Sequence, residues 1–199
     1  MLKLEPQALR FARNILVAFI PAAVLGVLLK DQIDLLLESA AVVGWTLVLG
    51  GIAILVIERL VTVGEDVAVA ELRLSRVVGI GVAQCLAMVP GVSRSGATIM
   101  GALSMGVGRK TAAEFSFFLA VPTMLGATTL QLWDHRHELA NGAGTVGWHQ
   151  IAIGSMVSFV VALAVIKAFV AYVSRHGFAP FAWYRIVVGI AAIAWLALR

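Results

Sequence analysis

The chain has 199 residues, of which 61% are hydrophobic and 13% are charged, and its mean hydropathy is +0.97. Soluble domains are roughly half apolar and a quarter charged, so this composition excludes an ordinary water-soluble domain. The formal net charge is +4, but the Lys and Arg residues stand singly between apolar runs and form no basic stripe. We therefore expect a protein that contacts membrane lipids and no nucleic acid.

Several apolar stretches approach or reach the roughly 20 residues that a membrane span requires. They are residues 14–29, 39–57, 112–133, 151–173 and 180–198, the first being short unless it extends into its flanks. Lipid offers no partner to unpaired backbone groups, and no alternating strand pattern appears, so each stretch is expected to be a helix. The predicted fold class is all-α: one polytopic membrane domain over residues 1–199 with about five transmembrane helices.

A further apolar segment, residues 77–108, is interrupted by Pro90 and by several glycines. The interruption falls in the middle, at the sequence PGVSRSG (residues 90–96). Irregular backbone at membrane depth is tolerated only inside protein or beside a water-filled cavity. We therefore predict a re-entrant helix-loop-helix unit, and we refer to its non-helical middle as the tip.

The distribution of cations predicts the orientation in the membrane. If residues 77–108 enter and leave by one face, most Lys and Arg residues fall on the side of Arg10, whereas Lys30, Arg136 and Arg199 fall on the other. The positive-inside rule then places the N-terminus in the cytoplasm and the C-terminus outside.

The tip carries the residue types that bind phosphate. A guanidinium can hold phosphate oxygens through paired hydrogen bonds, hydroxyls add further donors, and glycines let backbone N–H groups approach an anion. A half-helix beginning at Ala97 would also direct its positive end at the bound group. The candidate catalytic residues are Arg94, Ser93 and Ser95, and the candidate substrate-binding residues are Gly91, Gly96 and Thr98.

Alternatives to an anion site exist for several of these polar residues. Arg94 could pair with Glu114 to stabilise the bundle, or Glu114 could form a capping box with Thr111 in the sequence TAAE. Lys167 and Arg185, also in apolar segments, are expected to extend to the lipid headgroups. Cys85 is expected to be a small core residue.

Three sequences make the pattern specific: AQCLAMVPGVSRSGATIMGALSMG (83–106), AAEFSFFLAVPTMLGAT (112–128) and PFAWYR (180–185). They resemble the bacterial undecaprenyl-diphosphatases of the BacA/UppP type. The resemblance implies an inner-membrane enzyme that converts undecaprenyl pyrophosphate to the monophosphate carrier of peptidoglycan synthesis. It also implies pyrophosphate binding by Arg94, dependence on Mg²⁺ or Ca²⁺, and resistance to bacitracin.

One departure from this family concerns the N-terminal region. Family members begin with another re-entrant unit that carries an ExxxE motif, and this chain starts after it, as the C-terminal two-thirds of the family fold would. At the comparable positions, residues 77–108 offer Gln84 and Met88, neither of which is a carboxylate. The metal ligands are therefore not identified from the sequence.

Two other functions fit the same pattern. Broken helices within inverted repeats are typical of transporters, so a lipid or anion transporter is one alternative. An inactive truncated paralogue that binds the lipid pyrophosphate without turnover is the other. The sequence leaves open whether two chains form a homodimer.

Overall fold

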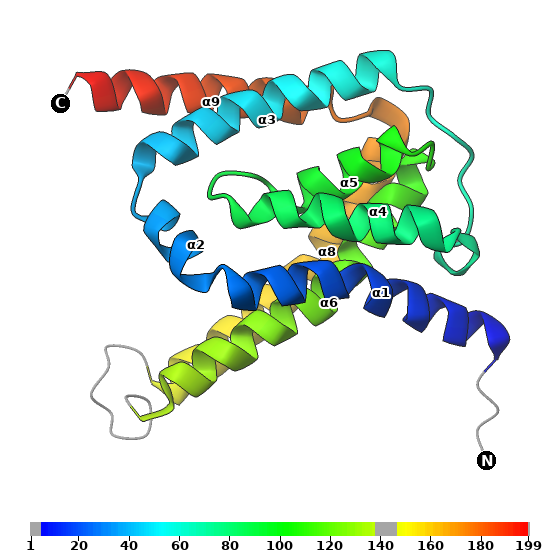
Figure 1. Cartoon of the computed structure of the whole chain (residues 1–199), viewed down its shortest axis with the longest axis horizontal. Coiled ribbons are helices and arrows are strands. Elements are labelled where there is room, and N and C mark those ends of the chain that lie inside the picture. The colour runs from blue at the N-terminus through cyan, green and yellow to red at the C-terminus, as the bar shows by residue number, and fades with distance from the viewer. Residues whose placement is uncertain (1–4, 138–146, 199) are drawn as a thin grey trace.

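The computed structural model describes residues 5–137 and 147–198, and every regular element within these ranges is a helix (Figure 1). Two short 3-10 segments, η1 (Val69–Glu71) and η2 (Cys85–Met88), accompany the α-helices. The α-helices in chain order are α1 (Pro6–Leu28), α2 (Lys30–Leu37), α3 (Ala40–Leu60), α4 (Leu74–Gln84), α5 (Arg94–Ser104), α6 (Arg109–Asp134), α8 (Trp148–His176) and α9 (Ala179–Ala197).

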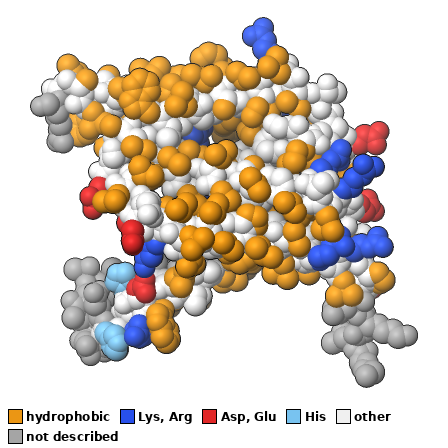
Figure 2. Space-filling model, in the orientation of Figure 1, with side chains coloured by type: hydrophobic (Ala, Val, Ile, Leu, Met, Phe, Trp, Pro, Cys, Tyr) orange, Lys and Arg blue, Asp and Glu red, His pale blue; other side chains and the backbone are white. Residues whose placement is uncertain are grey.

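Five described helices, α1, α3, α6, α8 and α9, are long and apolar enough to cross a membrane. Each coincides with one predicted stretch, although α1 begins at Pro6 rather than Asn14 because proline is well suited to the first turn of a helix. In α8 the only buried residue is Val173. Apolar side chains cover the broad face between two charged ends of the molecule (Figure 2). The chain is therefore a polytopic helical membrane protein.

The interrupted segment forms the predicted helix-loop-helix unit. Helices α4 and α5 pack against each other in opposite directions, so that Gly79 lies against Met105 and Gly101 against Ala83 (Figure 1). The segment therefore enters and leaves at the same end of the molecule. Cys85 is half-buried and donates to the carbonyl of Gly81 at 3.4 Å, so it is not the core residue that the sequence predicted.

The helix-loop-helix unit is held between α1, α6 and α3. Its core side chains, among them Ile80, Ile99 and Leu103, pack with Phe115 of α6. On the other side, Gly81 lets α1 approach so closely that a Cβ there would lie 2.6 Å from the carbonyl oxygen of Ala18. In a membrane the hydrophobic effect does not drive helices together, so small residues of this kind stabilise their packing by letting the backbones approach closely.

The segment between α3 and α4 caps the first turn of α6, although it lies more than 40 residues earlier in the chain. The Thr111 backbone N–H donates to Asp66 Oδ1 at 3.1 Å, and the Thr111 hydroxyl donates to the carbonyl of Val67 at 2.7 Å. Asp66 thus satisfies a free N–H at the start of α6. The predicted capping box between Thr111 and Glu114 is wrong, because α6 already begins at Arg109 and the Thr111 hydroxyl is bonded to Val67.

Helices α3 and α9 form a closely packed antiparallel pair above the unit (Figure 1). Glycines make the approach possible: a Cβ at Gly51 would lie 2.7 Å from the Ala182 carbonyl oxygen, and one at Gly189 would lie 2.9 Å from the Gly44 carbonyl oxygen. This pair forms one wall of a cavity of about 540 Å³ beside the tip.

Candidate functional site

The tip is a tight turn that ends in a capped helix. Gly91 has φ of +83°, a conformation that residues with a Cβ rarely adopt, and a Cβ there would also contact Thr46 Oγ1. The Ser93 hydroxyl accepts the Gly96 N–H at 3.1 Å and lies 3.2 Å from the Ser95 hydroxyl. Ser93 is therefore the N-cap of α5, and α5 begins at Arg94 rather than at the predicted Ala97.

Arg94 is half-buried on the side of α5 that faces α6. Its Nη1 donates to the carbonyl of Ser116 at 2.8 Å, and this is the guanidinium's only hydrogen bond within the described part of the chain. Arg94 also lines a cavity of about 320 Å³ between α1, the end of α4 and α6. Four of the five N–H groups of this guanidinium thus have no hydrogen-bond partner among the described residues.

The alternative role of Arg94 as a partner of Glu114 is wrong. Glu114 Oε1 instead lies 3.9 Å from Lys110 Nζ, one turn earlier in α6. Lys110 and Glu114 both lie within the first two turns of α6. No carboxylate therefore neutralises Arg94 within the described residues.

Gln84 lines the same cavity as Arg94 and is only 2% exposed. Both its amide nitrogen and its amide oxygen lack a partner among the described residues. Unpaired buried amides are costly, so this residue signals a ligand or an ordered water at the Arg94 cavity. Met88, the other residue at a position comparable to the family's carboxylates, lines this cavity too.

Thr98 lies between α5 and α6. It is 1% exposed, shares a 2.7 Å hydrogen bond with the Ser116 hydroxyl, and bonds to the Arg94 carbonyl at 3.0 Å. These contacts fix the first turn of α5 on the segment of α6 that also holds the Arg94 guanidinium. The predicted contact of Thr98 with substrate stays a prediction, and its geometry is that of a positioning residue.

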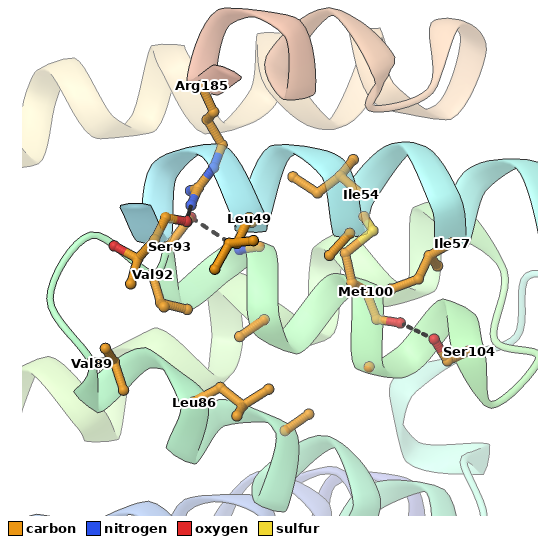
Figure 3. Close-up of a pocket in the computed structure, with 17 residues that line it drawn as sticks. Leu49, Ile54, Ile57, Leu86, Val89, Val92, Ser93, Met100, Ser104 and Arg185 are labelled. Atoms are coloured by element: carbon orange, nitrogen blue, oxygen red, sulfur yellow. Dashed lines mark hydrogen bonds between the residues drawn. The ribbon is translucent and has the colours of Figure 1, made fainter. Parts of the chain in front are cut away.

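A larger cavity of about 540 Å³ lies on the other side of the tip, between α4, α5 and the α3–α9 pair (Figure 3). Ser93 and Gly96 line it, as do Thr46 and Arg185. A smaller adjoining hollow of about 230 Å³ adds Ser95. Most other lining side chains are apolar, including Leu49, Ile54, Leu86, Val92 and Met100. Ser93 and Gly96 thus line the larger cavity and Ser95 the smaller hollow, whereas Arg94 lines the cavity on the other side of the tip.

Arg185 does not extend to the lipid headgroups, although the sequence predicted that it would. The structure turns it inward, where Nη2 donates to the Gly91 carbonyl at 3.0 Å and to the Thr46 carbonyl at 3.3 Å. The inward direction follows from Gly50 of α3, since a Cβ there would lie 2.5 Å from Arg185 Nη2. A charged residue well inside an apolar helix was the available signal. Lys167, by contrast, is exposed on α8.

The fold and this geometry define a class: a helical membrane protein in which the tip of a helix-loop-helix lies between two cavities, one lined by Arg94 and the other by Ser93 and Arg185. The sequence model of the family described as bacitracin resistance protein BacA matches residues 2–191. The chain belongs to this family, as its motifs predicted.

Curated relatives extend over nearly the whole chain. The undecaprenyl-diphosphatase of Novosphingobium aromaticivorans is 64% identical over 199 residues, which is 100% of this chain and 74% of the relative. Proteins of the same name from Rhizorhabdus wittichii and Sphingopyxis alaskensis are 57% and 56% identical, and the chain covers 72% and 73% of their lengths.

Proposed function

We propose that this chain is a membrane-bound undecaprenyl-diphosphatase, which hydrolyses undecaprenyl pyrophosphate to undecaprenyl phosphate and phosphate. Family membership and the 64% identity to an undecaprenyl-diphosphatase support this function. The observation that carries it is the Arg94 guanidinium, which is held by one carbonyl at the start of α5 and leaves its other N–H groups beside a cavity. Such a cation can hold phosphate oxygens through paired hydrogen bonds.

Hydrolysis requires in-line attack of an oxygen nucleophile on the terminal phosphorus. A new P–O bond forms to that oxygen, while the anhydride P–O bond breaks and leaves the lipid monophosphate. Arg94 neutralises the negative charge that gathers on the phosphate oxygens. The hydroxyls of Ser93 and Ser95 orient the headgroup, and the N-terminus of α5 adds a favourable dipole.

Mg²⁺ or Ca²⁺ is implied by the family resemblance and, when bound, would supply further charge neutralisation. Such hard cations take carboxylate and carbonyl oxygens as ligands. Among the described residues there is no group of three or more His, Cys, Asp or Glu that could hold a metal, and no carboxylate lines the cavities beside the tip. The described residues therefore do not fit a metal site, and the steps above use none.

The cavity of about 540 Å³ is suited to the isoprenoid chain next to the headgroup. Its walls are mostly apolar, while its polar groups gather at Ser93 and Arg185 (Figure 3). An apolar pocket with a few placed polar groups is the usual form of a ligand site. The lipid thus lies with its chain against α3 and its headgroup at the tip.

The protein functions in the bacterial inner membrane, with the N-terminus in the cytoplasm and the C-terminus outside. The excess of Lys and Arg on the side of Arg10 supports this orientation. In this role it recycles the carrier lipid of peptidoglycan synthesis and contributes to bacitracin resistance. A homodimer stays a prediction from the sequence.

The test is release of inorganic phosphate from undecaprenyl pyrophosphate by the purified 199-residue chain in detergent, with and without Mg²⁺ or Ca²⁺. Arg94→Ala should lower turnover by about a hundredfold or more, because the cation acts on charge that develops in the transition state. Arg94→Lys should retain part of the activity. The matched control is Lys167→Ala, which removes an exposed cation that lines none of the cavities beside the tip and should leave turnover unchanged.

Two results would replace this function. Lipid that binds without phosphate release under any metal condition would establish a binding protein. Lipid movement across a vesicle bilayer without release would establish a transporter. Equal turnover by the wild type and Arg94→Ala would remove the central role of Arg94.

A further inference from the structure

Arg185 lies within the apolar helix α9, where an exposed charge would face lipid. A cation in that position costs on the order of 3 kcal/mol by insertion scales. The side chain instead points from α9 toward Ser93 at the start of α5 (Figure 3). We therefore expect the Arg185 guanidinium to have a hydrogen-bond acceptor or an anion at the tip.

A backbone carbonyl of the tip accepts one of the hydrogen bonds of Arg185. Arg185 Nη2 donates to the Gly91 carbonyl at 3.0 Å, and the Thr46 hydroxyl donates to the preceding carbonyl, that of Pro90, at 2.6 Å. These two carbonyls stand in the non-helical turn, where no helix hydrogen bond satisfies them. Arg185 and Thr46 thus anchor the tip to the α3–α9 pair.

The carbonyls do not neutralise the charge or occupy all its donors. A guanidinium has five N–H groups, and both described bonds of Arg185 start from Nη2. The Nε atom is buried and has no hydrogen-bond partner in residues 5–137 and 147–198. No carboxylate of these residues forms a salt bridge with Arg185. A partly buried charge without an opposite charge is unfavourable, so the surroundings of the Arg185 guanidinium favour an anion.

The groups around Arg185 are those that bind an anion. Ser93 and Gly96 line both hollows next to it, and Ser95 lines the smaller one. The first turn of α5, which starts at Arg94, presents its positive dipole end between the two cavities. Hydroxyls, a helix N-terminus and an unpaired cation therefore meet at one place.

We propose that Arg185 is a second headgroup-binding residue, which selects a diphosphate lipid over the monophosphate product. This inference rests on the proposed function. Arg94 and Arg185 lie on cavities on opposite sides of the start of α5, and a diphosphate offers two charged groups where a monophosphate offers one. Arg185 therefore adds more to the binding of the substrate than to that of the product.

The experiment measures dissociation constants of the detergent-purified chain for farnesyl pyrophosphate and for farnesyl monophosphate, two short isoprenoid probes. Arg185→Gln should weaken binding of the diphosphate by about tenfold to a hundredfold, and that of the monophosphate by less than about threefold, as expected for loss of a hydrogen-bonded charge. Arg185→Lys should restore part of the selectivity.

Two further variants separate binding from anchoring. Thr46→Val removes the other anchor of the tip without changing charge, so it should weaken both lipids by a similar factor. Lys167→Gln removes an exposed cation of α8 and should change neither constant. An Arg185→Gln variant that weakens both lipids equally, or neither, would overturn the proposal.

The binding experiment and the phosphate-release assay can fail independently of each other. If the wild type releases no phosphate, the enzyme proposal fails, while the ratio of the two dissociation constants still decides the role of Arg185. If the wild type hydrolyses the lipid and Arg185→Gln keeps the wild-type ratio, only the Arg185 proposal fails.

Discussion

The two cavities beside the tip differ in how their arginine relates to the helix-loop-helix unit. On one side Arg94 belongs to the unit, and α6 holds it through the Ser116 carbonyl. On the other side Arg185 belongs to α9 and itself holds the unit through the Gly91 carbonyl. In the proposed function, loss of Arg94 removes one headgroup contact, whereas loss of Arg185 removes a headgroup contact and one of the hydrogen bonds that anchor the tip to the α3–α9 pair.

The largest expected effect comes from disrupting the tip, the turn that lies between the two cavities. Gly91→Ala places a Cβ at φ of +83° and against Thr46 Oγ1, which should destabilise the fold by roughly 2–4 kcal/mol and abolish phosphate release. Thermal unfolding in detergent and a phosphate assay measure the two effects. Gly154→Ala on α8 is the control, because a Cβ there meets nothing within 4 Å. Equal melting of Gly91→Ala and wild type would contradict the structure of the tip.

A smaller change should affect the Arg94 side alone. Thr98→Val removes the 2.7 Å hydrogen bond with Ser116 and should cost about 1–2 kcal/mol, because it leaves a buried hydroxyl unpaired. Turnover should fall, while the selectivity between diphosphate and monophosphate set by Arg185 should persist. Thr129→Val, whose exposed hydroxyl donates to the Leu125 carbonyl one turn earlier in the same helix, is the control. Loss of selectivity in Thr98→Val would show that the two sides are coupled.

Gln84 offers a test with almost no cost in stability. Gln84→Leu removes an amide that has no partner among the described residues, so the free energy of unfolding should change by less than about 1 kcal/mol. If the amide serves a ligand in the Arg94 cavity, the KM for undecaprenyl pyrophosphate should rise severalfold. A strong destabilisation would instead reveal a protein partner.

The smallest effect is expected where a cation is exposed to water. Lys30 Nζ lies 3.0 Å from Asp134 Oδ2 at the end of the molecule formed by α2 and the end of α6. The hydrogen bond to Asp134 and the charge of this carboxylate raise the pKa of Lys30 above its ordinary value. The stabilisation is therefore complete below the ordinary pKa of about 10.4 and is lost only as the pH rises through the raised value.

Between pH 6 and 9, roughly, the melting temperature should thus not depend on Lys30, and Lys30→Gln should change it little, as for most exposed ion pairs. Melting curves across this range measure the effect. A large shift at neutral pH would mean that this pair is shielded from water.

The helices and the broken segment could be predicted from the sequence because their signals are local. Apolar length located the five spans, and Pro90 with its neighbouring glycines located the tip. The same local signal, a cation at a helix break, made Arg94 a candidate site residue, and the structure places it at the start of α5. The family motif agreed with both.

The remaining contacts depended on residues distant in the chain. The capping box failed because Asp66 and Val67, more than 40 residues earlier, already bond to Thr111. Helix α5 begins three residues before the predicted Ala97, because the Ser93 hydroxyl accepts the Gly96 N–H and caps the helix at Arg94. The direction of Arg185 depended on Gly50 and on the Gly91 carbonyl, which come from other elements. Hydropathy along one helix contains no information about such partners.

The close α3–α9 pair has a mechanical consequence for entry of the lipid. Thr46 and Arg185, which grip two consecutive peptide groups of the tip, come one from each member of this pair. A tilt of the pair as one body would widen or narrow the mostly apolar cavity beneath it and would pull on the same peptide groups. The width of the cavity that would admit the isoprenoid chain and the position of the tip that would bind the phosphate are therefore mechanically coupled.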